Sequence, residues 1–190
     1  MADITRGKIL DAVIRLYSQY SYEEITTKQI MEEVGITKGG LYWHFASKED
    51  MFKEAFELCY EKVLEHSRIG IDENAPAIDC LKRRLKNLVL FHGKFPYNVP
   101  FVAKYMQRIG AKQSEHFSQN NELIGDIAKF VKKGLKNKEI IDLPENVLAH
   151  MIINCDYYGI MENFRRHPEY YENEPLIDKI IETFYKALLP

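Results

Sequence analysis

The chain has 190 residues, of which 46% are hydrophobic and 28% are charged, and its formal net charge is −2. This composition is ordinary for a soluble globular protein of one or two domains, and no apolar run is long enough to span a membrane. The N-terminus lacks the features of a secretory signal, and the three cysteines are odd in number and far apart. We therefore expect a cytoplasmic protein without a disulfide framework.

The charge is distributed unevenly along the chain. Residues 1–66 carry 8 Lys and Arg against 12 Asp and Glu, whereas the remaining residues carry 18 against 16. Bulk basicity, a common sign of nucleic-acid binding, is therefore absent from the first third. Because salt screens charges more than about 8–10 Å apart, a local surface can still bind a polyanion, although we expect only modest DNA affinity outside specific sites.

Helical periodicity begins close to the N-terminus. Apolar residues recur three to four positions apart and predict a first helix from about Asp3 to Gln19. The adjacent hydroxyls of Thr26 and Thr27 can then cap a second helix. Gly35 stands where that helix should end in a left-handed residue. The sequence thus predicts two helices joined by a short connection.

A third, short helix is predicted to follow directly. Thr37 is its expected N-cap, it runs to about Phe45, and Ser47 then caps a fourth helix with acidic residues in its first turn. Two short helices joined by a tight turn are typical of a helix-turn-helix, whose second helix enters the major groove of DNA. Residues 34–48 contain no carboxylate, so this segment suits a polyanionic partner.

The rest of the chain is also predicted to be helical. After the periodicity lapses near residue 67, we expect helices at about 76–92, 98–110, 115–137, 145–167 and 175–189, with prolines at most of the breaks. No segment alternates with the period of a strand, so the predicted fold is all-α with about nine helices. We divide the chain into a helix-turn-helix domain (1–47), a connecting helix (48–67) and a larger helical body (68–190).

The candidate DNA-binding surface lies on and beside the third helix. Its first residues occupy the end that reaches base edges in this motif. Two consecutive glycines cost about 0.5–1 kcal/mol each inside a helix, which suggests that the backbone must approach a partner closely. A tight helical turn with an aromatic plug is the alternative interpretation. The expected contact residues are Thr37, Lys38, Gly39, Gly40, Tyr42, His44 and Lys48.

The segment TTKQIMEEVGITKGGLYWHFASKEDMF closely resembles the N-terminal DNA-binding domain of the TetR family, particularly its AcrR-like branch. The similarity extends from about Arg6 to Phe52, with Tyr17 where Phe is usual. By this resemblance, family positions that contact DNA correspond to Thr27, Lys38, Tyr42, His44 and Lys48. Thr27 is included on this ground alone, and a plain helix cap is its alternative role. For Arg6, a solvated helix start is favoured over a mobile arm that contacts DNA.

The resemblance also implies that residues 68–190 form a ligand-binding and dimerisation domain whose last two helices pair with a second subunit. Segment 175–189 is apolar on so much of its surface that it needs cover from more than one neighbour, which suits a homodimer. Aromatic and methionine side chains could line a pocket for a bulky apolar molecule, although core packing is the alternative for each. The candidates are Phe91, His92, Phe101, Tyr105, Phe130, Tyr157 and Met161.

A second basic stretch lies outside the helix-turn-helix. It consists of Lys82, Arg83, Arg84 and Lys86. Such a cluster can bind nucleic acid, but leucines interleave with it at helical spacing. We therefore favour a solvated helix face.

The sequence as a whole predicts a homodimeric, DNA-binding transcriptional regulator. The favoured form is a repressor released from a palindromic operator by a small apolar or aromatic ligand. Control by a protein partner or by no effector is one alternative, and a helical enzyme or a thiol sensor that uses Cys155 or the histidines is another. We predict no enzymatic activity, catalytic residue, metal site or cofactor. The expected partners are double-stranded DNA, a small-molecule effector and a second copy of the chain, but no membrane.

Overall fold

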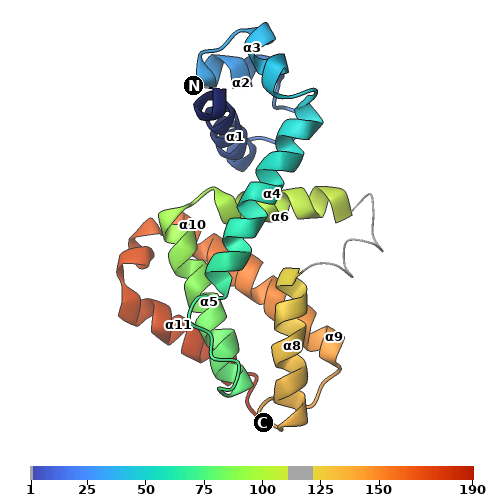
Figure 1. The fold of residues 1–190 in the computed structure, drawn as a ribbon. Helices are drawn as coiled ribbons and strands as arrows, with labels where there is room; N and C mark the ends of the chain where they lie inside the picture. Colours follow the sequence, from blue (N-terminus) through green and yellow to red (C-terminus); the bar gives the residue numbers. More distant parts are fainter. Residues whose placement is uncertain (1, 111–121) are drawn as a thin grey trace. The chain divides into compact units, whose positions relative to one another are not determined.

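The computed structural model describes residues 2–110 and 122–190, except for the side chains of residues 2–4, 110 and 156–158. These residues form helices and no strand, which confirms the predicted all-α fold (Figure 1). The chain divides into two compact units: unit 1 comprises residues 1–62 and 97–108, and unit 2 comprises residues 63–96 and 109–190. Among the described helices, none has the length and apolarity needed to cross a bilayer.

The helix boundaries follow the sequence predictions closely. Unit 1 contains α1 (Ala2–Gln19), α2 (Thr27–Val34), α3 (Lys38–His44), most of α4 (Lys48–Ser67) and nearly all of α6 (Asn98–Gly110). Unit 2 contains α5 (Ala77–Lys94), α8 (Glu122–Lys136), α9 (Glu145–Asn154), the π-helical η1 (Cys155–Met161), α10 (Glu162–Arg166), the 3-10 helix η2 (Pro168–Glu172) and α11 (Glu174–Lys186). Because α9, η1 and α10 follow one another without a break, together they form the predicted helix 145–167. The predicted start of helix 115–137 lies outside the described residues.

Local capping interactions define the helix-turn-helix. The Thr26 hydroxyl accepts a hydrogen bond from the Gln29 N–H at 3.2 Å, and the Gln29 side chain accepts one from the Thr26 N–H at 2.7 Å. This reciprocal capping box fixes the start of α2, so Thr26 is the cap rather than Thr27. Gly35 ends α2 with a left-handed φ of 72°, and Thr37 then caps α3 by accepting from the Gly40 N–H at 3.2 Å.

An aromatic core holds unit 1 together. The Tyr17 ring meets the rings of Phe52 and Phe101 edge-on, each at a centroid distance of 5.2 Å. Phe101 and Tyr105 of α6 are buried in this unit. Segment 98–110, which the sequence division counted with the body, therefore packs largely with the helix-turn-helix.

Two cations of α6 strengthen this attachment. The Lys104 ammonium donates to the carbonyl oxygens of Tyr17 at 2.7 Å and Tyr20 at 3.1 Å, where α1 ends. A cation at a helix C-terminus interacts favourably with the carbonyls that lack a helical partner. The Arg108 guanidinium binds both carboxylate oxygens of Glu49 at 3.0 Å and lies 3.6 Å from the centre of the Tyr22 ring. Lys104 and Arg108 thus join α6 to three other parts of unit 1.

In unit 2, α5 packs against both α8 and α11, and α8 packs against α9. The predicted solvated basic face on α5 is wrong for three of its four residues. Arg84 is buried, while Lys82 pairs with Glu182 and Lys86 with Asp178 of α11, both at 2.6 Å. The partners lie on other helices, because α11 supplies carboxylates to the two lysines and the Leu123 carbonyl of α8 accepts from Arg84 at 3.3 Å. No pattern within α5 could reveal these contacts.

Candidate nucleic-acid interface

The short helix α3 has one buried side and one exposed side. Leu41 is fully buried and Phe45, four residues later, is 3% exposed, so these two side chains anchor the helix to the core. Because one helical turn takes 3.6 residues, residue 43 lies about half a turn and residue 42 about a quarter turn away from both, so these two face outward. Tyr42 is accordingly 44% exposed and Trp43 is 73% exposed. The exposed residues Thr37, Lys38, Gly39, Tyr42 and Trp43 form what we call the α3 face.

The two glycines sit in the first turns of α3. A Cβ atom added at Gly39 would meet nothing within 4 Å, and one added at Gly40 would have only ordinary contacts, the nearest at 3.5 Å. Nothing within the described chain therefore requires glycine at position 39. Glycine weakens a helix interior by up to about 1 kcal/mol relative to alanine, so the pair lowers the stability of α3 and leaves its backbone bare at Gly39.

Many carboxylates of unit 1 are paired with basic side chains. Glu33 binds Arg15 at 3.0 Å, Glu49 binds Arg108, and Glu54 binds Arg6. These pairings reduce the local effect of the acidic excess in residues 1–66. Together with the absence of carboxylates from residues 34–48, they leave the α3 face suited to a polyanion.

Three other predicted contact residues are less exposed to solvent. The Lys48 ammonium donates to the Tyr22 carbonyl and lies 3.9 Å from the centre of the Tyr22 ring, and burial lowers the pKa of this lysine. Thr27 is the first residue of α2 and is half-buried. His44, the last residue of α3, is half-buried beside Trp43, with a ring distance of 4.7 Å. For all three, contact with DNA stays a prediction.

Arg6 contradicts the favoured interpretation of a solvated helix start. Its guanidinium donates to the His44 carbonyl at 2.6 Å and to the Glu54 carboxylate at 2.8 Å. These partners lie 38 and 48 residues further along the chain, so no local sequence pattern could have indicated the contact. Arg6 thus supports the end of α3 through contacts that the sequence did not reveal.

The ligand-binding candidates are divided between the two units. Phe101 and Tyr105 lie in unit 1, and the side chain of Tyr157 is not among those that the structure describes. Those of unit 2 are buried; they are Phe91, His92, Phe130 and Met161. The ring Nδ1 of His92 is hydrogen-bonded to the Tyr171 hydroxyl, and burial, reinforced by Arg165, lowers the pKa of His92 to about 4. A role in ligand binding stays a prediction for all seven.

Comparison with known proteins identifies the N-terminal segment. Residues 9–55 match the family model of bacterial regulatory proteins of the tetR family. The HTH-type transcriptional regulator AcrR of Shigella flexneri is 39% identical over 64 residues, which cover 34% of this chain and 30% of that protein. The negative transcriptional regulator IcaR of the biofilm operon in Staphylococcus aureus is 27% identical over 134 residues, covering 66% of this chain and 68% of its own.

Solved structures extend the similarity of the fold to both units. A TetR family transcription regulator from Marinobacter aquaeolei aligns with a TM-score of 0.78 and 15% identity, covering 98% of this chain and 96% of that one. All these relatives are regulators, which confirms the prediction of a regulator rather than an enzyme. The matched segment contains the whole of α2 and α3. Residues 9–55 therefore belong to the TetR family of bacterial regulatory proteins, and the chain as a whole has the fold of TetR family regulators.

Proposed function

We propose that the protein is a homodimeric transcriptional repressor that binds a palindromic operator, with α3 of each subunit in the major groove. The observation that carries the proposal is the α3 face, which combines exposed donors, a bare glycine backbone and no carboxylate. A major groove about 12 Å wide admits one α-helix. Lys38 lies at the N-terminal end of α3, and in a helix-turn-helix this end reaches the base edges.

Repression is the proposed direction of control. IcaR, a negative regulator, is similar over two thirds of this chain. A protein that covers a promoter needs no contact with the transcription machinery, so a DNA-binding domain and a dimer are sufficient for repression.

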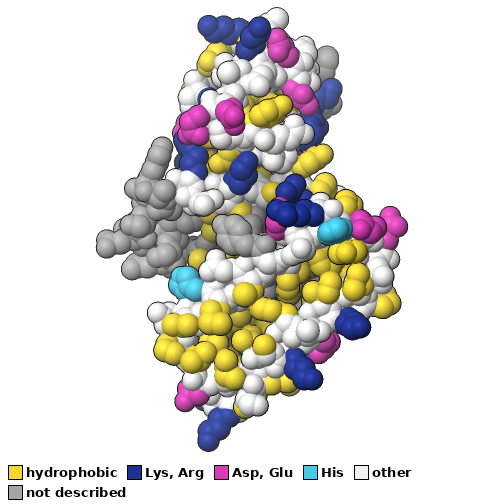
Figure 2. Space-filling model, turned by 180° about the vertical axis from the view of Figure 1, so that it is seen from behind, with side chains coloured by type: hydrophobic (Ala, Val, Ile, Leu, Met, Phe, Trp, Pro, Cys, Tyr) yellow, Lys and Arg dark blue, Asp and Glu magenta, His cyan; other side chains and the backbone are white. Residues whose placement is uncertain are grey.

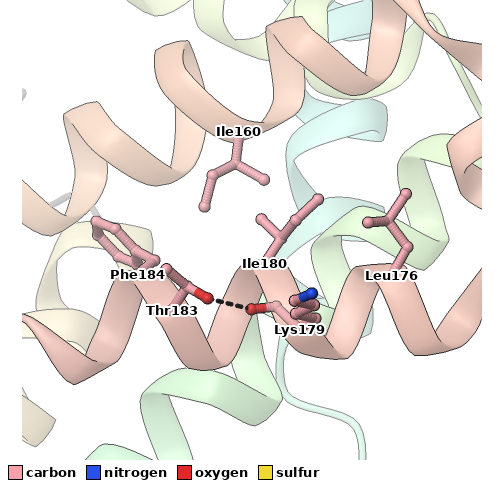
Figure 3. A pocket seen from close by; sticks show the side chains of 6 residues that line it. All are labelled: Ile160, Leu176, Lys179, Ile180, Thr183 and Phe184. Atoms are coloured by element: carbon pink, nitrogen blue, oxygen red, sulfur yellow. Dashed lines mark hydrogen bonds between the residues drawn. The ribbon is translucent and has the colours of Figure 1, made fainter.

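A second apolar side of α11 supports the homodimer. Its buried stripe of Ile177, Ile181 and Tyr185 lies on a helix that packs against α5. A second stripe is only partly covered and lines a groove of about 400 Å³ with Ile160 of η1 (Figure 3). The groove residues are Ile160, Leu176, Lys179, Ile180, Thr183 and Phe184. A helix that is apolar on two sides needs a second neighbour, and the same stripe on another copy would supply it.

Helix α9, which leads directly into η1, also carries exposed apolar side chains. Its Val147 and Met151 side chains are 41% and 45% exposed. Figure 2 shows hydrophobic side chains gathered over one face of unit 2. Two-fold pairing through one shared patch would give the dimer the symmetry of a palindromic operator.

Release by a small apolar or aromatic ligand is the last part of the proposal. Unit 2 contains buried aromatic and methionine side chains on α5, α8 and η1, which are the usual lining of an apolar pocket. A ligand can change operator affinity only by binding one form of the dimer more tightly than another. We therefore expect the effector to weaken operator binding without competing for the α3 face.

Substitutions on the α3 face test the proposed function. A duplex enriched from a random-sequence pool by the full-length protein serves as the probe. Lys38→Ala and Tyr42→Ala should each weaken binding to this duplex at least about tenfold, because each removes a donor at the groove. Thermal melting and the oligomeric state should change little, since both side chains are exposed.

The matched control is Lys53→Ala, which removes an exposed lysine of α4 that lies outside the α3 face. Its binding should stay within about twofold of the wild type, as expected for a surface charge that DNA does not contact. Normal binding by both α3 variants would refute the assignment of α3 as the recognition helix.

A further inference from the structure

Arg6 joins three helices of unit 1 through one guanidinium. From α1 it donates through Nη1 to the His44 carbonyl at the C-terminal end of α3, at 2.6 Å. Through Nε and Nη2 it binds both carboxylate oxygens of Glu54 on α4, with an Nε distance of 2.8 Å. Its Cζ atom lies 4.3 Å from the centre of the Phe45 ring, directly after α3. The guanidinium thus contacts the end of the proposed recognition helix twice, at the His44 carbonyl and at the Phe45 ring.

The recognition helix has little stability of its own. It contains seven residues, two of which are glycines. Helices this short are unstable in isolation because nucleation is costly, and glycine adds a further penalty. Thr37 caps the N-terminal end, whereas the His44 carbonyl at the other end receives its hydrogen bond from Arg6. A cation at a helix C-terminus also favours the helix dipole.

The same contacts argue against a direct role for Arg6 on DNA. Its charge is already matched by Glu54, and both sides of its planar fork are engaged by the carboxylate and the carbonyl. Moving the guanidinium to a phosphate would leave the Glu54 carboxylate unpaired beside a polyanion. The geometry therefore favours a guanidinium that remains in place when DNA binds.

We propose that Arg6 and Glu54 are positioning residues for operator binding, which set the C-terminal end of α3 without contacting DNA themselves. This inference rests on the proposed function of α3. It has an unusual consequence for Glu54. Although a carboxylate repels DNA, removal of this one should weaken specific binding, because it orients Arg6 against α3.

The test is a double-mutant cycle with Arg6→Gln and Glu54→Gln in the full-length protein. The probe is the enriched duplex, with a scrambled duplex as the non-specific reference. Each single variant should bind the enriched duplex about tenfold more weakly, as for loss of a charge-assisted hydrogen bond. The double variant should bind the duplex about as weakly as either single variant, because each of the three variants disrupts the same contact of Arg6, held by Glu54, with the end of α3.

Two readouts separate positioning from a phosphate contact or from general destabilisation. The dependence of affinity on salt should keep the wild-type slope, whereas loss of a phosphate contact lowers the slope by about 0.9. Trp43, the single tryptophan of the chain, lies on α3 and reports directly on that helix. Its fluorescence anisotropy in the free variants should fall while far-UV circular dichroism shows the rest of the protein still folded.

The matched controls are Lys53→Gln and Glu57→Gln, an exposed pair on α4 that lies 4.0 Å apart and carries the same charges. Both should bind within about twofold of the wild type. The proposal is overturned if Arg6→Gln lowers the salt slope and Glu54→Gln binds as well as or better than the wild type. It is also overturned if both bind normally while Lys38→Ala does not. If Lys38→Ala also binds normally, the proposed function has failed instead.

Discussion

Gly39 serves the proposed DNA contact at the expense of helix stability. A methyl group at this position meets nothing within 4 Å in the chain, so Gly39→Ala should raise the stability of the free protein by about 0.5–1 kcal/mol. The same methyl group would stand between the α3 backbone and the duplex, so affinity for the enriched duplex should fall. For this one variant, chemical denaturation should therefore show a higher free energy of unfolding, and binding titration should show a lower affinity for the duplex.

Gly125→Ala is the matched control for this effect. Gly125 lies in α8, and a Cβ atom added there also meets nothing within 4 Å. The control should be more stable and bind DNA normally. If Gly39→Ala is also more stable and binds normally, close approach at position 39 is not needed.

At the scale of single residues, the sequence predicted those side chains whose environment depends on neighbours along the helix. The four-residue spacing of Leu41 and Phe45 defines the buried side of α3, so the exposure of Tyr42 follows directly. Lys48 and Arg6 were not predictable in this way. Lys48 meets the Tyr22 carbonyl, 26 residues away, and Arg6 meets partners even more distant. Such contacts depend on how separate helices pack.

The same distinction holds for whole elements. Helix boundaries were predicted well because caps such as Thr26 with Gln29, and Thr37 with Gly40, act over three residues. The grouping of α6 with unit 1 was not predicted. It depends on Phe101 meeting Tyr17 and on Lys104 meeting the end of α1, both more than 80 residues away.

Burial of His92 on α5 makes the stability of unit 2 depend on pH. His92 is buried beside the Tyr171 hydroxyl, and its pKa falls from an ordinary value of 6.5 to about 4. The unfolded chain therefore binds this proton more readily than the folded one. The contribution of His92 to the free energy of unfolding is fully present above pH 6.5. It is lost as the pH falls toward 4, by an amount on the order of 3 kcal/mol.

His92→Gln should remove this dependence because glutamine does not titrate. Urea denaturation at pH 7 and pH 4.5 should show a smaller loss of unfolding free energy for the variant than for the wild type. The comparison uses the difference between the two pH values, so a constant cost of the substitution cancels. An identical loss in both proteins would show that His92 is not the titrating group.

We expect the dimer to form through the partly covered stripe of α11. Ile180→Glu would place a charge in the apolar groove and should convert the dimer to monomers in sedimentation experiments, because unpaired charges are costly in a buried interface. The monomer should also bind the operator more weakly, because the two linked helix-turn-helix domains of a dimer bind two half-sites together. The matched control, Ile69→Glu, changes an isoleucine that is 56% exposed and lies outside the groove. A monomeric wild type, or a dimeric Ile180→Glu variant, would contradict this interface.

In the proposed complex, two α3 helices read the major groove of one duplex. Dimethyl sulfate modifies guanine N7 in the major groove and adenine N3 in the minor groove, so its pattern on the enriched duplex tests the claim directly. We predict protection and interference at guanines in two symmetric segments about 10 base pairs, or 34–36 Å, apart, with the pattern lost in Lys38→Ala. Interference confined to adenine N3, or a single asymmetric segment, would exclude binding of two α3 helices in the major groove.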